Sequence, residues 1–172
     1  KTMDQDEYDE LLRNETRMAY FDIIRKDLVK EPPNTDNIRI IIDQLIDALC
    51  KFVPSKVEIH KKIKADIYQE NITSTTMPNI VYGLINWIEQ FQSPADDKVT
   101  NLWKDDFQNT PNYVEYIVIF LEEYYAHSEK VYREVWEARK RFVSGESVVP
   151  PEHRPKVEGN NGIPTNIRTG RK

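Results

Sequence analysis

Two helices meet at a corner in the stretch Met77–Leu102, MPNIVYGLINWIEQFQSPADDKVTNL. The first half is apolar and predicts a buried helix, and Ser93 is a suitable N-cap for a second one. Pro94 fits the first helical position, where its missing N–H is harmless. Asp96 and Asp97 then place negative charge at the positive end of the helix dipole. We therefore expect a helix, a sharp corner and a second helix here.

Helical periodicity continues on the N-terminal side of this stretch. A first helix is expected over about Asp4–Val29, with an inward face made of Tyr8, Leu11, Leu12, Glu15, Met18, Phe21, Ile24 and Leu28. The next helix has the clearest period, carried by Ile38, Ile41, Ile42, Leu45, Ile46, Leu49 and Val53. Exposing seven such side chains would cost on the order of 10 kcal/mol, so this stripe must be core or interface.

A third, short helix is expected after Pro54, because Ser55 to Glu58 has capping-box spacing. Its inward residues are predicted to be Val57, His60, Ile63 and Ile67. In the fourth helix, Gly83 is expected to let a neighbouring helix approach closely. After the corner the inward stripe continues through Val99, Leu102, Trp103 and Phe107.

The longest helix is expected to begin at the cap-plus-proline signal Asn109-Thr110-Pro111 and to end near Val143. Its length of roughly 45–50 Å exceeds what a compact bundle needs, so we expect its end to project. The fold class is therefore all-α: an antiparallel bundle of about six helices over residues 1–143, with a long last helix and an extended C-terminal tail.

The tail, residues 144–172, is rich in proline and glycine and carries five Lys/Arg against three Asp/Glu. Apolar periodicity stops there, so the tail has no core of its own. We expect it to dock on a partner protein. The residues predicted to make this contact are Pro150, Pro151, Ile163, Ile167, Arg168 and Arg171.

Composition limits the classes of function. A net charge of −5 argues against general affinity for nucleic acid or for anionic membranes. The single cysteine, Cys50, excludes an internal disulfide and favours a reducing compartment. No apolar run reaches the roughly 18 to 20 residues of a membrane span, and the N-terminus is acidic rather than signal-like. An intracellular, cytoplasmic protein is predicted.

No catalytic or metal site is expected. His60, His127 and His153 are far apart and lack metal-ligand spacing, so neither a metal nor a cofactor is predicted. Asp96, Asp97, Asp105 and Asp106 could form an acid/base pair but are more simply helix-dipole partners and solvated surface. Cys50 is expected in the core, His60 partly buried, and His127 at the rim of the long helix.

Two surface patterns leave alternatives open. The basic run Lys56, Lys61, Lys62 and Lys64 either contacts phosphate or is plain solvated surface, which is the more usual role of such a run. The aromatic residues of the long helix are too many to be all core. Part of this stripe is therefore predicted to bind a partner, and the candidates are Tyr116, Tyr124, Tyr132 and Trp136.

Several short motifs follow one another in an order that resembles a known family. They are Ala19-Tyr20-Phe21-Asp22, Pro32-Pro33-Asn34, Leu45 to Cys50, Val53-Pro54, Ile59-His60, Ile63 to Ile67 and the Ser93 to Asp97 corner. Over about Tyr8–Phe142 the chain resembles the N-terminal part of the T-complex protein 11 family. That resemblance implies an all-helical, non-catalytic protein linked to cyclic-AMP signalling and to sperm flagellar function, with no active-site motif to carry over.

The sequence favours a non-enzymatic structural or interaction subunit of a larger assembly, such as an axoneme or a virus particle assembled in the cytoplasm. Its tail and the aromatic face of its long helix are expected to contact other subunits, and homo-oligomers are compatible with the sequence. The alternative is a signalling regulator of the cyclic-AMP-pathway type that binds its partners transiently. A mobile tail on a monomer would favour that alternative.

Overall fold

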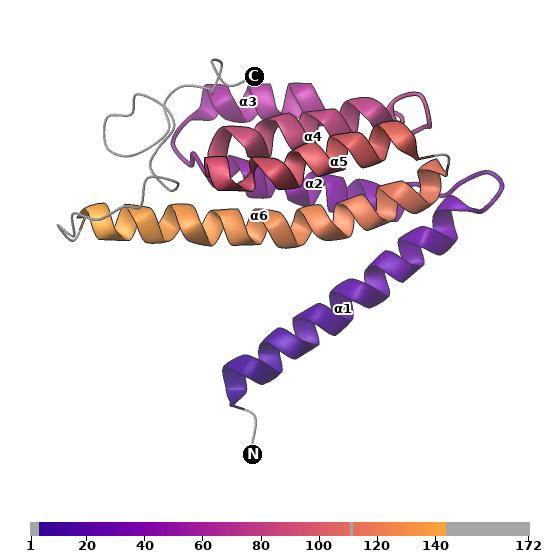
Figure 1. The fold of residues 1–172 in the computed structure, drawn as a ribbon. Coiled ribbons are helices and arrows are strands. Elements are labelled where there is room, and N and C mark those ends of the chain that lie inside the picture. Colours follow the sequence, from indigo (N-terminus) through magenta and orange to yellow (C-terminus); the bar gives the residue numbers. More distant parts are fainter. Residues whose placement is uncertain (1–3, 111, 144–172) are drawn as a thin grey trace.

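The computed structural model describes residues 4–110 and 112–143, which form six α-helices and one short 3₁₀ turn. The elements are α1 (Gln5–Leu28), α2 (Asp36–Cys50), α3 (Val57–Ile67), α4 (Met77–Phe91), η1 (Pro94–Asp96), α5 (Asp97–Asn109) and α6 (Tyr113–Val143). The all-α bundle predicted from the sequence is confirmed. Helices α2 to α5 are stacked on one side of the long α6, and α1 approaches α6 only with its C-terminal half (Figure 1).

The core lies between α2, α4 and α6. All seven apolar residues of the predicted α2 stripe are at most 4% exposed, so that prediction is confirmed. From the other two helices the core receives Val81, Leu84, Ile85, Ile88, Ile117, Val118, Leu121 and Tyr124, all fully buried. The Tyr124 hydroxyl donates to the Leu84 carbonyl at 2.7 Å, which joins α6 to α4.

Gly83 lets α3 and α4 pack at short range, as expected. A Cβ atom at this position would lie 2.9 Å from the Asp66 carbonyl oxygen and 3.0 Å from Cγ1 of Ile67. On the same interface the Trp87 indole donates to an Asp66 carboxylate oxygen at 2.8 Å. The glycine is therefore a packing requirement of the α3–α4 pair.

The corner is confirmed, with a difference in how its residues act. Ser93 stands at the N-cap position of the η1 turn without a capping hydrogen bond from its side chain, which donates to Asp96 instead, and Pro94 stands at the first position of the turn. Asp96 is buried rather than solvated, and it accepts a hydrogen bond from Lys130 of α6 at 2.7 Å. Burial alone would raise the pKa of this carboxyl, but the Lys130 ammonium holds it below its ordinary value. The corner thus fastens α5 to α6.

Three expectations about local structure are wrong. Val57 and Leu102, predicted to face inward, are each 59% exposed. The capping box at Ser55 does not form, since α3 begins after Lys56 without a side-chain cap. His127 is buried against the Trp103 ring rather than at the rim.

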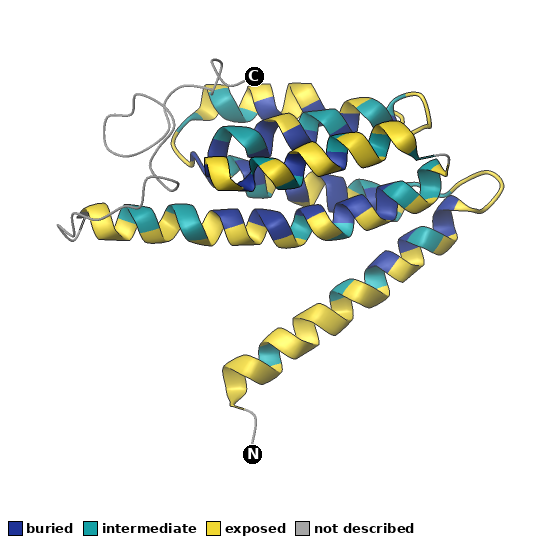
Figure 2. Ribbon diagram, viewed as in Figure 1, coloured by how far each residue is buried: buried dark blue, intermediate teal, exposed yellow. Residues whose placement is uncertain are grey.

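The first half of α1 is the largest departure from the predicted inward faces. In this half Tyr8, Leu11 and Leu12 are 42–49% exposed and Glu15 is exposed as well, while Met18 just beyond it is 63% exposed. Figure 2 shows this half of the helix exposed on nearly all sides. We call residues 5–16 the arm. The arm leaves the bundle as α1 diverges from α6 (Figure 1).

Helix geometry explains why the arm leaves. At about 100° per residue, Tyr8 and Leu28 lie roughly 160° apart around α1, so the apolar residues counted as one stripe belong to two faces. The face that buries Phe21 and Leu28 continues through Glu10 and Asn14 in the arm. Such polar side chains gain little from contact with a core, so packing against α6 stops where they begin.

Candidate binding groove

Buried polar side chains inside the bundle are hydrogen-bonded to one another in a single network. His127 Nε2 donates to Gln92 Oε1 at 2.9 Å, while the Gln92 amide donates to Asp97 and to Thr100. Thr100 in turn donates to Glu89 at 2.7 Å. Burial lowers the pKa of His127, so its neutral form is favoured. This network fixes the α4–α5–α6 contact and leaves no acid/base pair directed at an open cavity.

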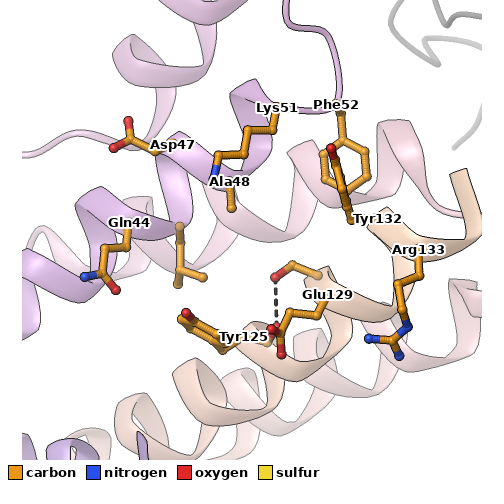
Figure 3. Close-up of a pocket in the computed structure, with 11 residues that line it drawn as sticks. Gln44, Asp47, Ala48, Lys51, Phe52, Tyr125, Glu129, Tyr132 and Arg133 are labelled. Atoms are coloured by element: carbon orange, nitrogen blue, oxygen red, sulfur yellow. Dashed lines mark hydrogen bonds between the residues drawn. The ribbon is translucent and has the colours of Figure 1, made fainter. Parts of the chain in front are cut away.

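A groove runs between α2 and α6 on the outside of the bundle. One wall carries Gln44, Asp47 and Ala48 of α2 and Lys51, which follows α2, and the other carries Tyr125, Glu129, Tyr132 and Arg133 of α6 (Figure 3). Leu45, Phe52 and Ser128 complete its lining, and its volume is about 630 Å³. Ala48 has a small side chain, so it adds little height to the α2 wall.

Aromatic packing holds the floor of the groove in place. The Phe52 ring stacks on Phe91 at a centroid distance of 4.6 Å and meets Tyr132 edge-on at 5.5 Å. Arg139 donates to the Phe52 carbonyl at 2.7 Å and thereby fixes the last turns of α6 against the end of α2. Because both walls are built on rigid helices, the groove exists before any partner binds.

A second depression continues the first toward α1. It has a volume of about 640 Å³ and shares Gln44, Tyr125 and Glu129 with the first. The rest of its lining comes from α1 and from the outer face of α2, namely Leu12, Arg13, Thr16, Arg17, Tyr20, Ile40 and Ile41. The two depressions therefore adjoin, and together their linings come from α1, α2 and α6.

Arg17 marks the place where α1 and α6 separate. Its guanidinium carbon lies 4.2 Å from the centroid of the Tyr125 ring, and its Nη2 donates to Glu129 at 3.0 Å. Arg25 makes the next contact inside the bundle, with Glu122 at 3.2 Å. These contacts hold the C-terminal half of α1 against α6.

The structure separates the four aromatic residues predicted to bind a partner. Tyr132 and Trp136 are 39% and 51% exposed, so they are accessible. Tyr124 is fully buried, which corrects its placement on a binding face: it is a core residue. Tyr116 is half-buried, and its hydroxyl donates to the Trp103 carbonyl at 2.9 Å.

The six tail residues predicted to contact a partner lie outside the described residues. They are Pro150, Pro151, Ile163, Ile167, Arg168 and Arg171. The basic run is described and is mostly exposed. Lys61 pairs with Glu58 at 3.3 Å, and Lys64 faces a depression together with Asp43 and Asp47. Two carboxylates beside this lysine would repel a phosphate, which favours the solvated-surface interpretation there.

Sequence reasoning missed the α2 and α1 walls of the groove. The sequence did contain one signal of the α2 wall, namely Ile40. This large apolar residue precedes Ile41 but lies outside the regular apolar stripe of α2, and it is 47% exposed in the structure. Ala48 gives no signal at all in a sequence, because a small residue between two stripes is ordinary. Cys50 lies next to this region, is partly buried against the core, and has a thiol whose pKa is raised by burial.

Among residues 4–110 and 112–143, no cluster of three or more His, Cys, Asp or Glu side chains is placed to hold a metal ion. Within the same ranges, no helix is both long and apolar enough to cross a membrane. No protein-family model, no curated protein and no solved structure matches this chain.

Proposed function

We propose that this protein is a non-enzymatic helical interaction subunit of a larger protein assembly, and that it binds an amphipathic helix of another subunit in the groove between α2 and α6. The observation that carries the proposal is that two depressions adjoin on the outside of the bundle, where they share Gln44, Tyr125 and Glu129. The first of them lies between α2 and α6 and suits a further helix, and recognition of this kind is common among helical proteins.

The chemistry of the groove suits such a partner. Its floor is apolar or aromatic, from Ile41 and Leu45 to Phe52, and its rims carry Lys51, Glu129 and Arg133. An apolar centre with a charged rim is the usual composition of a protein–protein contact. Tyr132, accessible at one end, supplies the kind of large amphipathic ring that contributes strongly to binding energy.

Polar groups in the groove serve the packing of the helices. Glu129 is paired with Arg17, and the Ser128 hydroxyl donates to the Tyr125 carbonyl at 2.9 Å. Catalysis would need an acid, a base or a nucleophile directed at one bound atom. Glu129 and Ser128 are instead engaged with neighbouring groups of the helices. The arrangement supports a binding role.

The proposal extends to features that the sequence alone suggests. Residues 144–172 are proposed as a second anchor on the same assembly. Membership of the T-complex protein 11 family and a place in the cytoplasm, in an axoneme or in a cytoplasmic virus particle are proposed on the motif order quoted above. Deleting residues 148–172 is expected to leave the helical fold intact and to abolish incorporation into the assembly.

The groove is tested by filling it. Ala48→Arg places a long charged side chain on the low part of the α2 wall, whereas the control Ala126→Arg alters an exposed alanine of α6 that does not line the groove. Both variants should keep the circular dichroism of the native chain. Affinity purification of the tagged full chain from its native source should lose its partner subunits with Ala48→Arg alone. Retention of every partner by Ala48→Arg at native yield would refute the proposal.

A further inference from the structure

The arm and the last turns of α6 are two apolar surfaces without a partner among the described residues. On the arm, Tyr8, Leu11 and Leu12 are 42–49% exposed, and Met18 just beyond it is 63% exposed. On residues 130–142, which we call the α6 end, the exposed apolar residues are Tyr132, Trp136 and Phe142 at 39–61%. Clusters of exposed large apolar residues on a folded protein mark contact surfaces.

The two surfaces have opposite charge. The arm carries five acids against one base: Asp6, Glu7, Asp9, Glu10 and Glu15 against Arg13. The α6 end carries five bases against two acids: Lys130, Arg133, Arg139, Lys140 and Arg141 against Glu134 and Glu137. Two arms would repel each other, whereas an arm and an α6 end attract.

The antiparallel geometry for this contact already exists within one chain. Arg25 pairs with Glu122 and Arg17 pairs with Glu129, so α1 advances toward its N-terminus as α6 advances toward its C-terminus. Continuing the same row of α6 in helical steps leads to Tyr132, Trp136 and Lys140. The arm of the same chain has diverged from α6 by then (Figure 1), and among the described residues Tyr132 and Trp136 remain 39% and 51% exposed.

The chain's own arm is poorly suited to cover that row. If the arm swung onto its own α6, the face in line with Phe21 and Leu28 would bring Glu10 and Asn14 into the contact, while Leu11 and Leu12 would point elsewhere. A second copy is free to present the arm in a different rotation. Its Leu11 and Leu12 can then lie on Trp136 while its acids reach Arg133 and Lys140.

We propose that two copies of this chain pair through a two-fold axis, each laying its arm along the α6 end of the other. The proposal rests on the proposed function, because it names a second copy as one subunit of the assembly. The arm and the α6 end each extend roughly 18 Å, so the contacting lengths match. Each copy gives one arm and receives one, and the contact is therefore self-complementary and closes as a dimer.

Two charge-reversed variants of the full chain test the pairing. One carries Glu7→Lys and Glu15→Lys on the arm, where Glu15 lies one turn from Leu11 on the same face, and the other carries Arg133→Glu and Lys140→Glu on the α6 end. None of these four side chains has an ion pair within the described residues, and all four are exposed. Circular dichroism should therefore show native helicity for both.

Sedimentation velocity measures the dimer dissociation constant of each variant and of the mixture. Each variant alone should have a dissociation constant raised about tenfold or more, because like charges then face each other. An equimolar mixture should recover the wild-type value, since both contacts in the mixed dimer join opposite charges. Arm-to-arm pairing would leave the Arg133→Glu/Lys140→Glu variant unchanged, and that result overturns the proposal.

A wild-type chain that stays monomeric up to about 0.5 mM also overturns the pairing. The groove variant Ala48→Arg separates this failure from a failure of the proposed function. A monomer whose Ala48→Arg variant still releases partner subunits refutes the pairing alone. A charge-dependent dimer whose Ala48→Arg variant keeps every partner refutes the groove as a helix-binding site and leaves the pairing standing.

Discussion

The two halves of α1 form one continuous helix, yet only the second half belongs to the bundle. Phe21, Ile24 and Leu28 are at most 6% exposed, whereas Leu11 and Leu12 are 43% and 42% exposed. Both halves contain large apolar residues at helical spacing, so both form a helix. Only the second half carries them on the face directed at α6. The comparison shows that apolar spacing decides whether a helix forms, and the phase of that spacing decides whether it packs.

Truncating one leucine in each half should give the largest difference. Leu28→Ala removes buried methyl groups and leaves a cavity, which should lower the free energy of unfolding by about 2–4 kcal/mol. Leu11→Ala removes atoms that are already in water, and a change below about 0.5 kcal/mol is expected in dilute solution. Urea unfolding followed by circular dichroism measures both values.

The two variants are matched in residue type and in helix, so propensity cancels between them. The measurement must use protein concentrations at which the copies do not pair, since Leu11 belongs to the proposed dimer contact. Equal losses from the two truncations would show that the arm packs against the bundle in solution. The division of α1 into two halves would then be wrong.

The bundle was largely predictable because its signals are local. Prolines and the apolar period indicated where the helices begin and end, and the crowding around Gly83 followed from the absence of a side chain in an apolar helix. The orientation of α1 was less predictable. The residues of the predicted stripe from Leu12 to Ile24 follow one another in four consecutive steps of three, and these steps rotate the stripe away from its starting face. This rotation is not apparent when the apolar positions are only listed, because the list does not give their angles around the helix axis.

The candidate groove could be predicted only in part. Of the aromatic residues predicted to bind a partner, Tyr132 lines the groove and Trp136 is exposed beyond it, whereas Tyr124 belongs to the same stripe and is core. Its burial depends on α4 lying opposite, where the Leu84 carbonyl accepts its hydroxyl. The α2 wall consists of those α2 residues that α3, α4 and α6 leave exposed. Both features depend on how the helices pack against one another, so the sequence of a single helix does not predict them.

Acidic pH should weaken the bundle through His127. Burial lowers the pKa of this imidazole, the Asp96 carboxylate acts in the opposite sense, and the Lys130 ammonium adds to the lowering. The Gln92 carbonyl oxygen and the Trp103 ring also face it. In the unfolded chain the pKa is about 6.5. The stabilisation is therefore complete above pH 6.5 and is lost as pH falls, by at most about 1.4 kcal/mol per pH unit.

The control for this prediction is His127→Gln, which does not titrate. Urea unfolding at pH 7.5 and pH 5.5 should show a larger loss for the native chain than for the variant, by about 1 kcal/mol. The other two histidines, His60 and His153, are present in both proteins, so they do not distinguish the native chain from the variant. Asp96 stays ionised in this range, because its pKa lies below the ordinary value for an aspartate. An identical pH dependence would mean that His127 is not held neutral.

The smallest effect is expected at the branch point between the two halves. Arg17→Ala removes the ion pair with Glu129 and the cation–π contact with Tyr125. Since Glu129 is partly solvated, the loss in unfolding free energy should be only about 0.5–1 kcal/mol. Hydrogen exchange should nevertheless quicken near residues 17–21, where the packed half begins. Arg13→Ala, one turn into the arm, serves as the control and should change neither quantity. If both substitutions quicken exchange equally, packing ends inside the arm rather than at Arg17.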